Sequence, residues 1–446
     1  MLKYLSRLLL YLVRHSRMKK LAELEKNEYR SKEFLENLQE DKFLALIKHA
    51  KSNVPYYREN LEGIKIESLE DIASIPFLTK KVILRNKNQL KAQNYTSDRF
   101  HTDSTGGSTG EKLQFYSDKN EIRAVFLMRG NKWAGWKVGE KQAQLWGAHY
   151  DISKAGGLYR KLQSSLIHRN KMMSSYDMTK EDMFDYCKII NKHKPRIITG
   201  YASALYLFSE FIQNNDLKIH KPAGIISSAE TLHNHQREKI ETVFGCKVLN
   251  RYGCREVGNI AQECEEQSGL HINIEHVIVE IVDENGKPCK PGQTGEIVIT
   301  ELDNYAFPFI RYKIGDLGVL SDRNCDCGRR LPMLENVKGR IFDIIVGTNG
   351  NHLTGTFWTI LLREYVQGIN KFQVIQEEYG KLLLRLIVTN QYNEKGKAKL
   401  IKKIKENCGE DMNIDIELVD KIPLTESGKH RFIISKVSPF VAHIQD

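Results

Sequence analysis

Apolar stretches alternate with amphipathic ones in the middle of the chain. Short runs of apolar and β-branched residues at 196–200, 223–228 and 247–253 predict strands, and the segments 202–214 and 233–244 have the spacing of helices. Strands joined by helices of this length run parallel through right-handed crossovers. We therefore predict a parallel α/β core, in which ligands bind at the carboxyl ends of the strands.

The pattern changes on both sides of this core. Residues 271–320 combine strand patterns with glycine-rich turns, which predicts an antiparallel, barrel-like part appended to the core. Residues 21–62 are predicted to be helical, with one helix ending at Pro55, whereas 151–176 carries few signals and is expected to be irregular. Two strand patterns, a basic helix at 394–407 and a further strand predict a small α+β module at the C-terminus.

The fold class expected from these patterns is α/β. We expect a basic amphipathic helical segment at 1–40, a large domain at 41–338 that holds the parallel core and the antiparallel part, and a small α+β domain at 339–446. The length allows two or three domains with a large core.

The charge balance narrows the class of partner. Against 56 acidic residues the chain has 67 Lys and Arg, a formal charge of +11, which favours nucleotides, coenzyme A, anionic lipid or nucleic acid. The basic residues are spread along the chain rather than gathered in an arm, which disfavours specific nucleic-acid binding. Eight cysteines are too few for a disulfide scaffold and indicate a reducing cytoplasm.

The first 20 residues place leucine and valine on one helical face and lysine and arginine on the other. No stretch approaches the roughly 18 uninterrupted apolar residues of a spanning helix, and no signal-peptide cleavage site is visible. Two interpretations stay open: a helix docked on its own domain, or a basic amphipathic helix in peripheral contact with the inner face of the membrane.

An unbroken run of hydroxyl and glycine residues precedes the core: Thr105, Gly106, Gly107, Ser108, Thr109 and Gly110. Backbone N–H groups that no side chain shields can form a nest for phosphate oxygens. The flanking strand patterns predict a hairpin loop, and neither a P-loop ending nor a dinucleotide spacing is present. Taken alone, such a run favours a flexible linker, and the motifs that follow reverse that preference.

Further polar motifs follow in a distinctive order: SAE at 228–230, YGCRE at 252–256, RYKIGD at 311–316, GRIFD at 339–343 and PLTESGKHR at 423–431. With TGGSTG, this succession resembles the adenylate-forming acyl/aryl ligase superfamily. Within it the chain is similar to the phenylacetate–CoA ligase family, in its capsule-biosynthesis (CapK-like) branch. The resemblance extends from about residue 40 to residue 437.

The resemblance implies an ATP-dependent adenylation. A carboxylate would attack the α-phosphorus of ATP and release pyrophosphate, and a CoA thiol, or an amine or hydroxyl of a glycan or carrier, would then displace AMP. The branch points to surface polysaccharide biosynthesis. Neither the acid, the acceptor nor the oligomeric state follows from the sequence. Two alternatives are a basic zinc-containing nucleic-acid-binding protein and a non-catalytic, membrane-associated adenylate-binding scaffold.

The resemblance also implies roles for single residues. Residues 105–110 would wrap the β- and γ-phosphates, Asp316 would take both ribose hydroxyls, Arg340 would reach the ribose or a phosphate, and Glu256 would help to hold Mg²⁺. The adenine would be bordered by Ser228, Ala229, Glu230, Tyr252 and Gly253.

Lys429 is the principal catalytic candidate. By the resemblance it lies on a mobile small domain and enters the site only in the adenylating orientation, where it bridges the carboxylate and the α-phosphate. The small domain would turn about residues 339–343. Relatives carry an acidic residue two positions after the arginine, whereas this chain has Phe342 there, followed by Asp343.

Three thiols and one imidazole have the composition of a structural zinc site: Cys264, His271, Cys325 and Cys327. Because the spacing is not that of paired C-x2-C motifs, four unrelated buried residues are the alternative. No base is evident beside Cys254, which we expect to line the pocket rather than to act as a nucleophile. His149 and Tyr201 are candidates for the acyl pocket.

Overall fold

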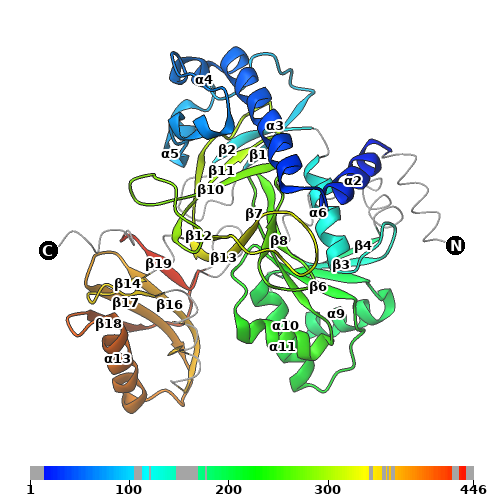
Figure 1. The fold of residues 1–446 in the computed structure, drawn as a ribbon. Coiled ribbons are helices and arrows are strands. Elements are labelled where there is room, and N and C mark those ends of the chain that lie inside the picture. Colours follow the sequence, from blue (N-terminus) through cyan, green and yellow to red (C-terminus); the bar gives the residue numbers. More distant parts are fainter. Residues whose placement is uncertain are drawn as a thin grey trace.

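The computed structural model describes residues 15–104, 113–119, 122–146, 169–175, 178–340, 345–353, 358, 361–362, 367–423 and 431–437. Figure 1 shows a large body built around one long, twisted sheet and a small body that contains the C-terminal strands. The two bodies correspond to the large and small domains expected from the sequence.

Five parallel strands form one half of the long sheet, in the order β4-β3-β5-β6-β7. They are β3 (Gln142–Leu145), β4 (Asn170–Met173), β5 (Ile197–Gly200), β6 (Gly224–Ser228) and β7 (Val248–Cys254), accompanied by helices α9 (Lys180–His193), α10 (Ala202–Asn214) and α11 (Asn234–Phe244). The predicted alternation of strands and helices is confirmed. β4 lies in the stretch expected to be irregular, which was wrong for these four residues.

The other half of the sheet is antiparallel and continues from β7 in the order β8-β9-β13-β12-β11-β10. Its strands are β8 (Gly258–Glu263), β9 (Leu270–Ile272), β10 (Val277–Val282), β11 (Thr294–Glu301), β12 (Tyr312–Ser321) and β13 (Met333–Arg340). The antiparallel part that we predicted is therefore joined to the parallel core by hydrogen bonds, in one sheet of 11 strands.

Helices and a hairpin precede the sheet: α2 (His15–Asn27), α3 (Lys32–Asn53), α4 (Pro55–Asn60), the 3-10 helix Leu69–Ser74, α5 (Lys80–Asn86), β1 (Phe100–Ser104), β2 (Gln114–Asp118) and α6 (Ile122–Trp133). α3 runs across the domain boundary expected at residue 40. Gln39 holds it there by donating to the carbonyl oxygens of Ile274 and Val277, at 3.1 and 2.8 Å. Among the described helices, none is long and apolar enough to cross a membrane.

α2 packs against α6 through an apolar face. Met18, Leu21 and Leu24 are buried in one cluster with Val125 and Phe126 of α6. For residues 15–27 this packing supports the docked interpretation of the N-terminal segment, while residues 1–14 lie outside the described part of the chain.

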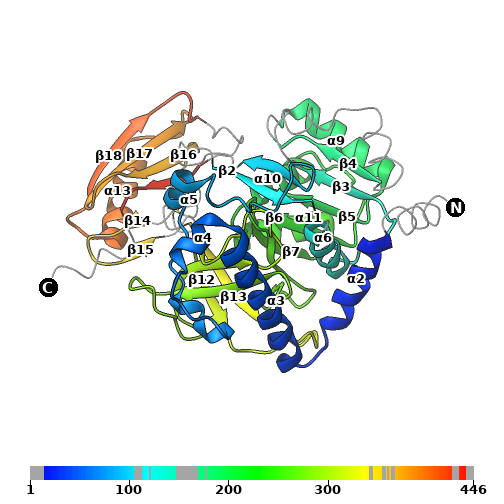
Figure 2. The same cartoon turned by 90° about the horizontal axis from the view of Figure 1, so that it is seen from above.

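The small domain contains β14 (Ile345–Val346), β15 (His352–Leu353), β16 (Ile369–Gln376), β17 (Lys381–Val388), α13 (Glu394–Cys408), β18 (Asn413–Leu418) and β19 (Ile433–Ser435). Its four-stranded sheet has the order β18-β17-β16-β19, which confirms the predicted strand–strand–helix–strand module and adds β19. Figure 2 shows α13 beside this sheet, where Leu400 and Ile404 are buried against Leu384. β19 begins shortly after the segment that contains Lys429.

The docking of α2 predicts the effect of truncating its central leucine. Leu24 is 0% exposed, so Leu24→Ala should lower the free energy of unfolding by about 2–5 kcal/mol through lost apolar burial and a residual cavity. Leu84→Ala, on α5 at a position 38% exposed, is the matched control and should change little. Denaturant unfolding of both variants checks this, and equal stabilities would show that α2 is not docked.

Candidate active site

Two of the predicted motifs meet at the carboxyl edge of the parallel strands. Ser228 ends β6, and Tyr252 and Gly253 lie near the end of the adjacent β7. Asp316 comes from β12 in the antiparallel half, and its Oδ2 accepts a 2.8 Å hydrogen bond from the Tyr252 hydroxyl. A Cβ on Gly253 would collide with the carbonyl oxygen of Gly258, so glycine is required at this position.

The loop after β6 is tied to the start of α10. Oε2 of Glu230 accepts hydrogen bonds from the backbone N–H of Ser203 at 2.9 Å and from its hydroxyl at 2.6 Å. Ser203 is in the first turn of α10, where backbone N–H groups lack partners within the helix and a carboxylate is favoured. Ala229, between Ser228 and Glu230, has a φ of 66°. Ser203 was not predicted, although a serine in the first turn of a helix that follows a strand is a recognisable signal.

Tyr201, predicted to line the acyl pocket, stands at the N-terminus of α10. Its ring lies against that of Trp146, with ring centroids 4.4 Å apart. Trp146 directly follows β3, so both aromatic residues occupy the carboxyl edge of the parallel strands. Trp146 belongs to the sequence LWGAHYD around His149, which we predicted to line the acyl pocket. His149 lies outside the described residues.

Glu256 lies in the three-residue turn between β7 and β8. Its Oε1 is 3.2 Å from the hydroxyl of Tyr312, which donates to it. In the same turn, Arg255 donates to the carbonyl oxygen of Ser104 at 3.0 Å. Since Ser104 ends β1 and precedes Thr105, the turn places Glu256 beside the entry to the glycine-rich segment.

Buried and partly buried ionisable groups lie beneath this turn. Arg123 of α6 binds both carboxylate oxygens of Glu301, at 2.9 and 2.8 Å. Asp303 is 2.7 Å from Nδ1 of His276 and 2.6 Å from the Lys42 ammonium. Burial raises the pKa of Glu301, although the positive charge of Arg123 acts to lower it. Burial also acts to raise the pKa of Asp303, but His276 and Lys42 outweigh it and hold that pKa below the ordinary value.

A second buried pair fixes the start of the strand that carries Asp316. Arg311 binds Glu280 with Nε at 3.2 Å and a terminal nitrogen at 2.8 Å from its two oxygens. The other terminal nitrogen donates to the carbonyl oxygens of Ala73 and Ile75, at 3.0 and 2.8 Å. Arg311 has a φ of 49°, a conformation uncommon for a side chain of this size, and its contacts hold it there.

The predicted zinc ligands come together. The ligand atoms of Cys264, His271, Cys325 and Cys327 all lie within 4.8 Å of one another. The Cys264 and Cys325 sulfurs are 3.6 Å apart, and the Cys327 sulfur is 3.4 Å from Nε2 of His271. Burial lowers the pKa of His271 to about 4, so the ring is neutral near pH 7, which is the form that binds metals. Three thiols and a neutral imidazole fit a tetrahedral zinc site.

Besides His149, three predicted groups lie outside the described part of the structure. The segment Thr105–Gly110 and Lys429 lie outside the described residues, as does the side chain of Arg340. The backbone of Arg340 pairs with Asp316 across β12 and β13. Burial, reinforced by Glu256, raises the pKa of Cys254 well above its ordinary value, which keeps it a poorly nucleophilic thiol.

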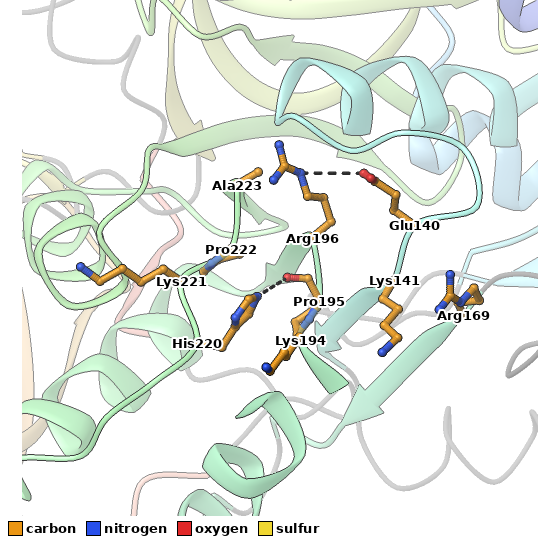
Figure 3. A pocket seen from close by; sticks show the side chains of 10 residues that line it. All are labelled: Glu140, Lys141, Arg169, Lys194, Pro195, Arg196, His220, Lys221, Pro222 and Ala223. Atoms are coloured by element: carbon orange, nitrogen blue, oxygen red, sulfur yellow. Dashed lines mark hydrogen bonds and ion pairs between the residues drawn. The ribbon is translucent and has the colours of Figure 1, made fainter. Parts of the chain in front are cut away.

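A cavity of about 340 Å³ opens at the opposite, amino edge of the parallel strands (Figure 3). It is lined by Glu140, Lys141, Arg169, Lys194, Pro195, Arg196, His220, Lys221, Pro222 and Ala223. Three of its basic side chains bind backbone carbonyls, at 3.0 Å for Arg196 and Arg169 and 3.1 Å for His220, and thereby secure the loops that enter the strands. Because none of the predicted site residues lines it, we place the active site at the carboxyl edge.

Two families match the chain: residues 105–302 match the AMP-binding enzyme family, and residues 345–436 match the CapK C-terminal domain. The chain is 26% identical over 413 residues to protein CapK of Staphylococcus aureus, covering 90% of this chain and 89% of that protein. It is also 26% identical over 441 residues to phenylacetate-coenzyme A ligase of Thermus thermophilus, covering 90% of this chain and 97% of that protein.

Among solved structures, the fold is similar to 2-hydroxyisobutyryl-CoA ligase in the postadenylation state in complex with 2-HIB-AMP. The TM-score is 0.72 at 18% identity, covering 92% of this chain and 91% of that chain. The same ligase in the thioesterification state, in complex with 2-HIB-AMP and CoA, gives a TM-score of 0.60 at 19% identity. This comparison also covers 92% of this chain and 91% of that chain. At such identities the likeness establishes a shared fold.

The lowered pKa of Asp303 predicts a pH-dependent contribution to stability. An acid whose pKa is lowered by folding stabilises the protein above its unfolded pKa, about 3.9, and loses that effect as the pH falls through the folded value. At neutral pH, Asp303→Asn should lower the free energy of unfolding by about 3 kcal/mol, because Lys42 loses its counter-charge and His276 loses its carboxylate partner.

The difference between wild type and Asp303→Asn should shrink as the pH falls below about 4. Denaturant unfolding across this range measures it, with exposed Glu284→Gln as a control of equal charge change. If the difference in the free energy of unfolding stayed constant with pH, the lowered pKa of Asp303 would be contradicted.

Proposed function

This chain is an adenylate-forming ligase of the phenylacetate–CoA ligase family, in its CapK branch, and from that premise we propose how its residues make an acyl-adenylate. The reaction joins a carboxylic acid to the α-phosphate of ATP, releases pyrophosphate and then transfers the acyl group. The observation that carries the proposal is the 2.8 Å hydrogen bond between Tyr252 and Asp316, because it holds an aromatic ring and a carboxylate together at one strand edge.

The nucleoside would bind between these two residues and the loop after β6. Asp316 can accept hydrogen bonds from the ribose hydroxyls, since a carboxylate has several acceptor positions. The ring of Tyr252 would lie against the adenine, bordered by Ser228, Ala229 and Glu230. The two bonds from Ser203 to Glu230 support this placement, because they fix the loop before the nucleotide arrives.

The phosphates would lie toward Thr105–Gly110 and Glu256. Oε1 of Glu256 is bonded to Tyr312, and its Oε2 has no hydrogen-bond partner among the described residues, so it fits a role in holding Mg²⁺. Magnesium bound there would neutralise charge on the phosphates. Arg255, through its bond to Ser104, fixes the distance between the turn and the start of the glycine-rich segment.

Lys429 would supply the positive charge at the α-phosphate. Negative charge builds on the phosphoryl group during the reaction, and a preorganised cation stabilises the transition state most where that charge develops. The TM-score is higher against the postadenylation state than against the thioesterification state, which supports a domain arrangement closer to the former. A turn of the small domain about residues 339–343 would then exchange Lys429 for the acceptor-facing surface.

For the acceptor, we propose an amine or hydroxyl of a glycan or carrier, in surface polysaccharide biosynthesis. The similarity to CapK over most of both chains supports this choice. Coenzyme A is the second candidate, supported by the similarity to phenylacetate-coenzyme A ligase. The match of the two families to both domains leaves the nucleic-acid-binding alternative without support.

We further propose that Cys264, His271, Cys325 and Cys327 hold a structural zinc ion. The donor set has four ligands with no open position, so the site would do no chemistry. It would connect the end of β8, β9 and the loop between β12 and β13. The ion would thereby stabilise the strands that separate Tyr252 from Asp316.

The role of Lys429 predicts the behaviour of Lys429→Ala. ATP–pyrophosphate exchange, measured with an acid selected from a panel of carboxylic acids, should fall by about 10²–10³-fold, while AMP still binds the large domain. Lys421→Ala, which removes an exposed lysine from the same part of the chain, should retain exchange. Full exchange by Lys429→Ala would contradict the role. Wild-type protein that shows no exchange with any acid of the panel would instead favour the non-catalytic scaffold.

The zinc proposal predicts about one zinc ion per chain in protein purified without chelator. The double variant Cys325→Ser/Cys327→Ser should lose the metal because it removes two of the four ligands. Cys246→Ser/Cys289→Ser alters two cysteines outside the cluster and should keep it. Elemental analysis measures the zinc content per chain, and wild-type protein that contains little zinc would refute the site.

A further inference from the structure

The turn that carries Glu256 is anchored by the side chains of Arg123 and His276. Arg123 of α6 donates to the carbonyl oxygen of Glu256, and Nε2 of His276 lies 2.9 Å from the carbonyl oxygen of Val257. These are successive residues of the short connection between β7 and β8. The backbone on the carboxyl side of Glu256 is therefore held at two adjacent positions.

Both ring nitrogens of His276 face oxygen atoms that only accept hydrogen bonds. Nε2 faces the Val257 carbonyl, and Nδ1 is 2.7 Å from Oδ2 of Asp303. Asp303 is ionised near pH 7, because His276 and Lys42 outweigh burial and hold its pKa below the ordinary value. His276 therefore connects the backbone of the turn to the Asp303 carboxylate through a single buried ring.

His276 and Glu301 are buried beside the partly exposed Arg123. His276 is 0% exposed, and the ring of Phe126 stacks on it with ring centroids 4.7 Å apart. Glu301 is 1% exposed and takes both Arg123 bonds, while its Oε1 is 3.9 Å from Nε2 of His276. Buried pairs of this kind contribute little net stability but penalise any other arrangement. The network is thus suited to holding the turn in one geometry.

We propose that Arg123 and His276 are positioning residues for Glu256, which fix the turn so that the Glu256 carboxylate is directed toward Mg²⁺ and the nucleotide phosphates. The inference rests on the proposed function, because it assumes the metal-binding role of Glu256. Both residues act through the backbone of the turn. Groups that orient a metal ligand change metal affinity or activity by about 10–100-fold when removed.

The test compares the binding of MgATP and of AMP by calorimetry, without a carboxylic acid, in Arg123→Gln, Arg123→Lys and His276→Gln. We expect MgATP to bind about 10–100-fold more weakly to Arg123→Gln and His276→Gln, with AMP binding within about twofold of wild type. Arg123→Lys keeps one cationic donor and should recover part of the affinity. Combined with Glu256→Gln, Arg123→Gln should add no further loss.

Arg129→Gln provides the matched control. Arg129 lies on the same helix, is 0% exposed and binds both oxygens of Glu275, at 2.9 and 3.0 Å, but does not contact the turn. An equal loss in Arg129→Gln, or a parallel loss of MgATP and AMP binding, would reduce the effect to general destabilisation and overturn the inference. The inference would also be overturned if the Arg123 and His276 variants bound MgATP normally while Glu256→Gln bound MgATP weakly. If Glu256→Gln itself binds MgATP normally, the proposed role of Glu256 fails.

Discussion

Tyr252 and Asp316 can share a hydrogen bond because one sheet carries both of their strands. β7 is the last parallel strand, and β8, β9 and β13 connect it to β12 through antiparallel pairing. If the antiparallel strands formed a separate layer, the aromatic ring and the carboxylate would belong to different bodies. The cluster of three cysteines and His271 lies along this bridge, with side chains from the end of β8, from β9 and from the loop before β13.

Buried arginine–glutamate pairs connect distant segments around that sheet. Arg129 joins α6 to the connection before β10 through Glu275, and Arg311 joins the start of β12 to β10 through Glu280. Such pairs add little net stability, since desolvation offsets the attraction, but removing one partner leaves an uncompensated buried charge. They therefore select a single packing for the segments around the site, and preorganised groups need no rearrangement when the nucleotide binds.

The sequence predicted the elements whose signals are local. The alternation between 196 and 253 gave the parallel strands and helices, and the hydroxyl, carboxylate and aromatic residues of the motifs pointed to their common edge. β4 was missed because Asn170–Met173 is short and its parallel pairing with β3 comes from the fold rather than from periodicity. Arg123, His276 and Ser203 were missed for a related reason: their partners are far away in sequence, or are backbone atoms that no pattern specifies.

The proposed function requires a nucleotide to bind at the carboxyl edge, between β6, β7 and β12. A crystal structure of the protein with AMP is the sharpest test of this position. It should show ribose hydroxyls within hydrogen-bond distance of Asp316 and the adenine against Tyr252, next to residues 228–230. AMP bound in the basic cavity at the amino edge of the same strands, with nothing at Asp316, would contradict it.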